Sequence, residues 1–218
     1  MRFCLAKIQT DTNFRHRDVE KLRGFMGNYF IDQDIFHNHK GDYEFQYRFP
    51  KVQYKFIDNQ LCIFAMEDSI EIMQESLRKL DYIQIGQDKI EIKQLNFEEY
   101  KDEFKVDTDL HQYQFETIWL ALNQENYPKY RQGEIDLNKQ IQNNLLSNFK
   151  GLGIKVEERI MAKGNFVEET VSLKDIKMLG FKGTFITNVN IPRYMSLGKR
   201  QSIGFGIVKK SNSEGGAR

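Results

Sequence analysis

The fold is decided by residues 61–80, LCIFAMEDSIEIMQESLRKL. The segment from Leu61 to Ala65 is continuously apolar, which is typical of a strand. Asp68 and Glu71 stand three residues apart, the spacing of a capping box at the start of a helix. The apolar residues that follow recur at helical spacing: Ile70, Met73, Leu77 and Leu80. The stretch therefore predicts a strand followed by an amphipathic helix.

The neighbouring segments continue this alternation. Residues 1–9 predict a strand, and Asp18 is expected to cap a helix whose apolar residues share one face: Val19, Leu22, Phe25, Met26, Tyr29 and Phe30. Aromatic and β-branched residues alternate over 43–56, with a break at Pro50, and indicate strand structure. Residues 82–95 predict a further strand. The order β-α-β-β-α-β is that of a ferredoxin-like or RNA-recognition-type domain.

The second half of the chain predicts a related α+β unit that is modified and richer in strands. Residues 96–109 are charged and poorly periodic, so we expect a link between domains. A helix is expected over 137–149, ended by Gly151, and strands are expected over 113–122, 154–162, 166–173 and 178–189, with a turn at 163–165. The expected domains are 1–105 and 110–210, followed by a disordered tail at 211–218.

A glycine-rich stretch precedes the last predicted strand: Gly198-Lys199-Arg200-Gln201-Ser202-Ile203-Gly204-Phe205-Gly206. Its three glycines allow backbone conformations with positive φ, and its adjacent cations suit a phosphate. A P-loop is excluded because Arg200 follows Lys199 and Arg193 occupies the position of the first glycine. A dinucleotide fingerprint is excluded because these glycines precede a strand. The alternative is a tight hairpin that carries a lysine and an arginine in solvent.

Composition indicates a soluble, cytoplasmic protein with a substantial core. Of 218 residues, 40% are hydrophobic, the mean hydropathy is −0.61, and no apolar run reaches the roughly 18 residues of a membrane span. The N-terminus lacks the apolar stretch of a signal peptide. Cys4 and Cys62 stand alone and are expected to be buried reduced thiols. No association with membranes is expected.

Charge is distributed unevenly along the chain. The net charge is only +1, which argues against indiscriminate coating of nucleic acid. Residues 159–210, however, contain ten Lys or Arg and three Asp or Glu, a net charge of +7. This segment surrounds the glycine-rich stretch, so we expect an anionic ligand to bind there.

Two of the four histidines, His37 and His39, stand two residues apart. In extended backbone this spacing places both rings on one face, where one ring can act as a base and the other as an acid. A polar loop without chemistry is the alternative. A zinc site would need a third and usually a fourth ligand, and the other candidates are scattered, so no metal or cofactor is expected. His16 and His111 are expected to be surface residues.

The sequence resembles the CRISPR repeat-processing endoribonucleases of the repeat-associated mysterious protein superfamily. The residues that carry the resemblance are residues 36–39 and 47–55 in the first half, and residues 181–185, Asn188, Pro192 and residues 198–206 in the second. The resemblance covers nearly the whole chain. It implies tandem ferredoxin-like domains and metal-independent cutting of a precursor transcript within its repeats, by attack of a 2′-hydroxyl that leaves a 2′,3′-cyclic phosphate.

On this resemblance, His37 and His39 are the expected catalytic residues, and Tyr47 assists by hydrogen bonding. RNA contacts are expected from two groups of residues: Lys199, Arg200, Ser202, Gly198, Gly204, Gly206 and Arg193, and, following the histidines, Arg48, Lys51 and Lys55. The expected partner is CRISPR repeat RNA. A homodimer and membership of a larger CRISPR effector complex both stay open. The rival functions are a repeat-binding subunit that does not cut, and a ferredoxin-like pair of domains that binds a small molecule or a protein.

Overall fold

The computed structural model describes residues 1–36, 49–173 and 176–211. They form two compact units. Unit 1 consists of Met1–Asp102 together with Ser202–Gly204, and unit 2 consists of Glu103–Gln201 together with the chain from Phe205 onward. The tip of the glycine-rich stretch, residues 202–204, is therefore part of unit 1.

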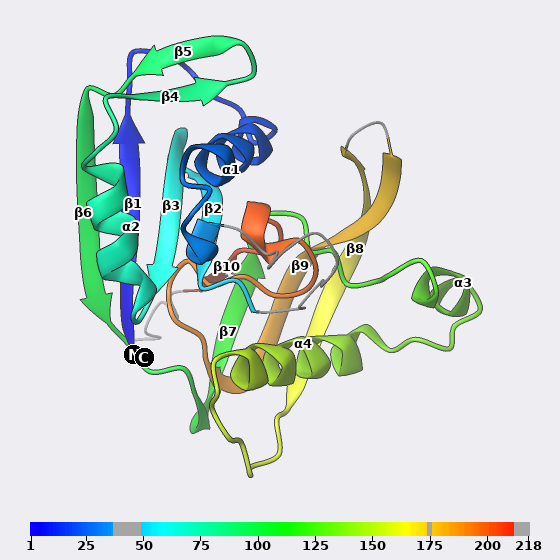
Figure 1. The fold of residues 1–218 in the computed structure, drawn as a ribbon. Helices are drawn as coiled ribbons and strands as arrows, with labels where there is room; N and C mark the ends of the chain where they lie inside the picture. Colours follow the sequence, from blue (N-terminus) through cyan, green and yellow to red (C-terminus); the bar gives the residue numbers. More distant parts are fainter. Residues whose placement is uncertain (37–48, 174–175, 212–218) are drawn as a thin grey trace, which may run out of the picture. The chain divides into compact units, whose positions relative to one another are not determined.

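Unit 1 contains a four-stranded antiparallel sheet in the order β2-β3-β1-β6 (Figure 1). Its strands are β1 (Arg2–Gln9), β2 (Val52–Ile57), β3 (Gln60–Met66) and β6 (Gln94–Lys101). Its helical segments are α1 (Asp18–Tyr29), the short η1 (Asp34–Phe36) and α2 (Ser69–Leu77). The chain order β1-α1-β2-β3-α2-β6 confirms the predicted β-α-β-β-α-β plan.

Both helices of unit 1 form as their apolar spacing predicts, but their N-termini differ from expectation. Asp18 is the first helical residue of α1, and its carboxylate accepts a hydrogen bond from the Arg15 backbone N–H at 3.0 Å. The expected capping box of α2 does not form, because Asp68 makes no side-chain cap bond and pairs with Lys51 at 2.7 Å. Glu71 pairs instead with Arg2, at 2.6 Å.

The strand predicted over 82–95 is two strands and a turn. β4 (Tyr82–Ile85) and β5 (Asp88–Glu91) form a hairpin of their own. The chain reverses at Gly86, whose φ of 69° is readily adopted only by glycine. The sheet strand is β6, which pairs with β1 from Gln94↔Gln9 to Lys101↔Arg2. The expectation that residues 96–109 form a link is therefore wrong, since most of them are strand.

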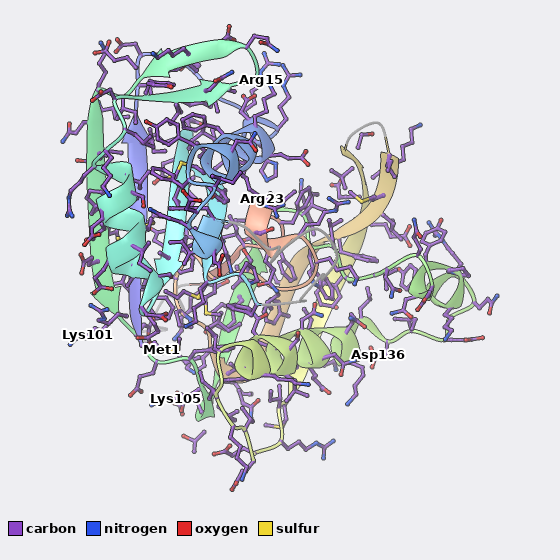
Figure 2. All side chains as sticks on the ribbon, viewed as in Figure 1. Met1, Arg15, Arg23, Lys101, Lys105 and Asp136 are labelled. Atoms are coloured by element: carbon purple, nitrogen blue, oxygen red, sulfur yellow. The ribbon has the colours of Figure 1, made fainter. Side chains whose placement is uncertain are left out.

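Unit 2 contains a four-stranded sheet in the order β10-β7-β9-β8. The strands are β7 (Lys105–Phe115), β8 (Ala162–Leu173), β9 (Ile176–Asn190) and β10 (Val208–Lys210). The helices are α3 (Asn126–Arg131) and α4 (Leu137–Gly151), and the short η2 (Gln201–Ile203) runs into unit 1. The helix predicted over 137–149 is confirmed, and the side chain of Asp136, labelled in Figure 2, caps it by accepting from the Asn138 N–H at 2.8 Å.

One strand prediction and one turn prediction in unit 2 are wrong. Residues 154–161 form no strand, and residues 163–165 are not a turn but lie inside β8. Gly164 pairs with Phe185, and a Cβ on Gly164 would lie 2.6 Å from the Thr184 carbonyl oxygen. This glycine is thus required by crowding between strands, not by a reversal of the chain.

The core of unit 2 is aromatic. Trp119 is fully buried, its ring lies 5.1 Å from that of Phe115, and its indole N–H donates to Asn144 of α4 at 2.9 Å. Ile141, Leu145 and Phe149 of α4 are buried. Helix α4 therefore anchors the segment around Trp119, from which the site described below is built.

Both cysteines are free and buried, as predicted. Burial raises the pKa of the Cys4 thiol to about 11 and that of Cys62 to about 12, so both stay protonated at neutral pH. Among the described residues, no helix is long and apolar enough to cross a membrane.

Candidate functional site

The glycine-rich stretch adopts the positive-φ backbone that its sequence predicts. Gly198, Gly204 and Gly206 have φ values of 89°, 82° and 68°, and Arg200 also has a positive φ of 58°. These conformations turn the chain between β9 and β10 while leaving Lys199 and Arg200 exposed.

Two of these glycines are required by the protein itself. A Cβ on Gly206 would lie 2.0 Å from the Leu197 carbonyl oxygen, and one on Gly198 would lie 2.7 Å from Nε1 of Trp119. The close approach at these positions is therefore to the protein's own chain. Gly198 and Gly206 shape the loop that presents the cations, and their predicted contact with RNA stays a prediction.

Helix α4 fixes the base of the loop through Asn148, which is fully buried. Its amide N–H donates to the Ser196 carbonyl at 2.8 Å, and its carbonyl accepts from Gln201 Nε2 at 3.0 Å. The Lys199 backbone N–H donates to the Leu120 carbonyl at 2.9 Å. The backbone of the two cations is thus held in place while their side chains point to solvent.

The tip of the loop is anchored on strand β2 within unit 1. Ile203 is buried, and a Cβ on Gly204 would lie 3.1 Å from the Tyr54 carbonyl oxygen. His16 hydrogen-bonds the backbone of Gly204, and burial lowers the pKa of His16. His16, expected to be a surface residue, is thus only partly exposed, because it lies against the loop.

The predicted cations of unit 1 differ in accessibility. Lys51 is half-buried and ion-paired with Asp68. Lys55 is fully buried, with its ammonium 5.3 Å from the centroid of the Phe64 ring. The predicted RNA contact of Lys55 stays a prediction, and it would require this buried ammonium to become accessible to a phosphate.

Four predicted site residues lie outside the described residues: His37, His39, Tyr47 and Arg48. The chain leaves the described structure after Phe36, which is buried, and re-enters it ahead of β2, whose first residue Val52 is also buried. Both flanks belong to unit 1. The strand that follows the histidines in sequence is thus the one on which Gly204 packs.

The remaining predicted residues lie on or near the loop. Arg193 is exposed, with its guanidinium 5.4 Å from the Tyr194 ring centroid, and Ser202 is half-buried. Lys199 and Arg200 also line a cavity of about 880 Å³ in unit 2. Residues 120–125, helix α3 and the adjoining parts of β8 and β9 complete its walls.

Sequence reasoning missed helix α3 and the side chains that it places at this cavity, Tyr127 and Arg131. The helix has six residues, too few for a recognisable hydrophobic period. A signal was present in residues 127–131, YPKYR, where aromatic residues alternate with cations. Within the described ranges, no group of three or more His, Cys, Asp or Glu side chains is arranged to hold a metal ion.

The two units define a protein with tandem ferredoxin-like domains and a glycine-rich loop before its last strand. Comparison with known proteins identifies the family. The family profile described as Cas6b N-terminal domain matches residues 1–103, and that of the Cas6b C-terminal domain matches residues 105–211. The chain belongs to the Cas6b family. The predicted resemblance and the tandem ferredoxin-like fold are both confirmed.

Solved structures agree with this assignment. "Crystal structure of Cas6b" aligns with 97% of this chain and 100% of its own, with 33% identity and a TM-score of 0.87. "Crystal structure of CRISPR RNA processing endoribonuclease Cas6b" covers the same shares, with 29% identity and a TM-score of 0.76. "Uncharacterized protein MJ0978" of Methanocaldococcus jannaschii is 38% identical over 113 residues, 49% of this chain and 77% of that protein.

Proposed function

We propose that this protein is an endoribonuclease that cuts CRISPR precursor transcripts within their repeats, without a metal ion, to produce mature guide RNA. The observation that carries the proposal is the match of both Cas6b domains over residues 1–103 and 105–211. It is supported by the full-length similarity to a structure named as a CRISPR RNA processing endoribonuclease.

The chemistry that we propose is internal transesterification. The ribose 2′-oxygen forms a bond to the adjacent phosphorus, and the bond from phosphorus to the 5′-oxygen of the next nucleotide breaks. A base accepts the 2′-hydroxyl proton, and an acid gives a proton to the departing 5′-oxygen. The products are a 2′,3′-cyclic phosphate and a 5′-hydroxyl, and no bound water or metal takes part.

We assign the acid and the base to His37 and His39. An imidazole has an unperturbed pKa of about 6.5, so one ring can be neutral while the other is protonated near neutral pH. The other two histidines have structural partners: His16 bonds the backbone of Gly204, and Nε2 of His111 lies 3.3 Å from Asp107. Tyr47 is assigned a hydrogen bond to the phosphate or the 2′-hydroxyl, because a phenol with a pKa near 10 is a poor base.

The glycine-rich loop is assigned to binding. Lys199 and Arg200 are exposed cations on a backbone that Asn148 and Leu120 hold in place. Neither side chain loses its proton readily near neutral pH, so both contact phosphates instead of transferring protons. Arg193, Ser202, Gly204, Lys51 and Arg48 are also assigned to RNA binding, with Gly204 acting through the anchoring of the loop tip.

The test is to incubate labelled repeat RNA with the protein in EDTA. The proposal predicts cutting at one position, and a fall of roughly 10² to 10⁴ in the single-turnover rate for His37→Ala and for His39→Ala, with RNA affinity little changed. His111→Ala is the matched control and should keep the wild-type rate. A shift of the RNA without cutting would indicate a repeat-binding subunit. If the protein does not bind the RNA and does not cut it, both functions are refuted.

A further inference from the structure

The cavity in unit 2 has more volume than one phosphate group needs. It is a half-open hollow of about 880 Å³, a volume comparable to that of pockets for small organic ligands, roughly 300 to 1,000 Å³. It lies between helix α3, the ends of β8 and β9, and Lys199 and Arg200 (α3, β8 and β9 are labelled in Figure 1). We call it the α3 cavity.

The residues that line the α3 cavity include aliphatic side chains and an exposed aromatic ring. Leu122, Met178 and Leu179 contribute aliphatic side chains. Tyr127 is 42% exposed. Aliphatic side chains together with an exposed ring suit a flat, uncharged group.

The ring of Tyr127 is held in place by Arg131. Nε of Arg131 donates to the Tyr127 hydroxyl at 3.2 Å, and the guanidinium carbon lies 5.3 Å from the ring centroid. Arg131 is fixed in turn by an ion pair with Glu168 of β8 at 3.2 Å, and Tyr130 donates to Glu168 at 3.0 Å. The aromatic surface is therefore organised before any ligand arrives, which lowers the entropic cost of binding.

Exposed cations also line the α3 cavity. They are Lys177, Lys199 and Arg200, none of which forms an ion pair within residues 1–36, 49–173 and 176–211. Glu125 is the opposing charge among the lining residues, since Arg131 is offset by Glu168. A lining that combines apolar side chains with exposed cations complements a ligand that has a flat base and negative charges on either side of it.

We propose that the α3 cavity binds one or two unpaired nucleotides of the RNA substrate. The base lies against Tyr127 and the aliphatic side chains, and the flanking phosphates contact Lys199, Arg200 and Lys177. A base within a duplex is stacked on its neighbours and does not enter a pocket, whereas an unpaired base stacks readily on an aromatic side chain. This inference rests on the proposed function, because it assigns a subsite for the same RNA.

The test separates the subsite from cleavage. The probe is labelled repeat RNA with a 2′-deoxy nucleotide at the cleavage position, so that binding is measured without cutting. Tyr127→Ala should weaken binding about 5- to 150-fold, the equivalent of one lost base stack. Tyr127→Phe keeps the ring and should bind nearly as well as wild type. Tyr127 is exposed, so both variants should fold normally, which thermal unfolding verifies.

Abasic RNAs identify the nucleotide in the cavity. Removing unpaired bases one at a time should find one or two positions at which the affinity of the wild type falls. At these positions the abasic RNAs should lower the affinity of Tyr127→Ala little further. Lys177→Glu should weaken binding, whereas the matched reversal Lys155→Glu, at a lysine that is 84% exposed, should not. The subsite would be overturned if Tyr127→Ala bound RNA with wild-type affinity, or if the effects of this substitution and of base removal on affinity were additive at every position. Neither result would bear on the proposed cleavage. Absence of RNA binding by the wild type would instead refute the proposed function.

Discussion

Replacing Lys199 and Arg200 together with alanine isolates the electrostatic part of RNA binding. Both side chains are exposed and form no ion pair within the described residues, so their removal leaves no buried charge without a partner. Their backbone is held by the Lys199 N–H bond to Leu120 and by the bonds of Asn148, none of which uses either side chain. The variant should therefore fold as the wild type does.

The expected magnitude follows from the release of counterions. Each contact with a phosphate of single-stranded RNA contributes about 0.7 to the slope of log affinity against log salt, so the loss of two contacts flattens the slope by about 1.4. Between roughly 50 and 200 mM salt, wild-type affinity should fall by a factor that is roughly sevenfold larger than for the variant.

The assay is fluorescence anisotropy with uncleavable repeat RNA at several salt concentrations. The matched control is Lys139→Ala combined with Lys155→Ala, which removes two exposed lysines outside the loop and should leave the slope unchanged. Saturating protein should largely restore the cutting rate of the Lys199/Arg200 variant, because these residues bind and do not transfer protons. An unchanged salt slope in that variant would refute the reasoning and leave the loop as a structural hairpin.

Two further predictions concern the loop as structure. Gly206→Ala should lower the unfolding temperature more than Gly86→Ala. The φ values of 68° and 69° are alike, but only the Cβ at 206 meets an atom, the Leu197 oxygen at 2.0 Å. Equal shifts of the two unfolding temperatures in calorimetry would contradict this prediction. Burial lowers the pKa of His16, so its contribution to stability is present above the unfolded pKa of about 6.5 and is lost as the pH falls below that value. His16→Gln should therefore reduce the loss of unfolding free energy between pH 7 and pH 5. An identical pH profile of the unfolding free energy would contradict the role of His16 at Gly204.

The sequence predicts those helices and strands that have a long pattern of apolar residues and whose structure depends on residues nearby in the sequence. Helix α4 follows from Leu137, Ile141, Leu145 and Phe149 at four-residue spacing, and its end at Gly151 is as expected. The β-α-β-β-α-β plan of unit 1 follows from similar patterns. A glycine is harder to interpret: Gly164 lies inside a strand and Gly86 forms a turn, and the difference is set by the neighbouring strand.

The accessibility of side chains depends on contacts between distant parts of the sequence. Alternation along β2 suggests that Lys55 is solvated, yet residues 202–204 pack on that strand, with a Cβ on Gly204 lying 3.4 Å from the Lys55 Cα. His16, which is half-buried, hydrogen-bonds the backbone of Gly204 in the same segment. The α3 cavity was missed for this reason as well, since residues around Tyr127, Met178 and Lys199 converge only in the folded chain.

The proposed chemistry is tested most directly by the chemical nature of the cut ends. Mass spectrometry of the products formed in EDTA should show a 2′,3′-cyclic phosphate on the upstream fragment and a 5′-hydroxyl on the downstream fragment. A single 2′-deoxy substitution at the cleavage position should abolish these products while binding persists. A 3′-hydroxyl with a 5′-phosphate, or cutting that appears only when a divalent metal is added, would contradict the account.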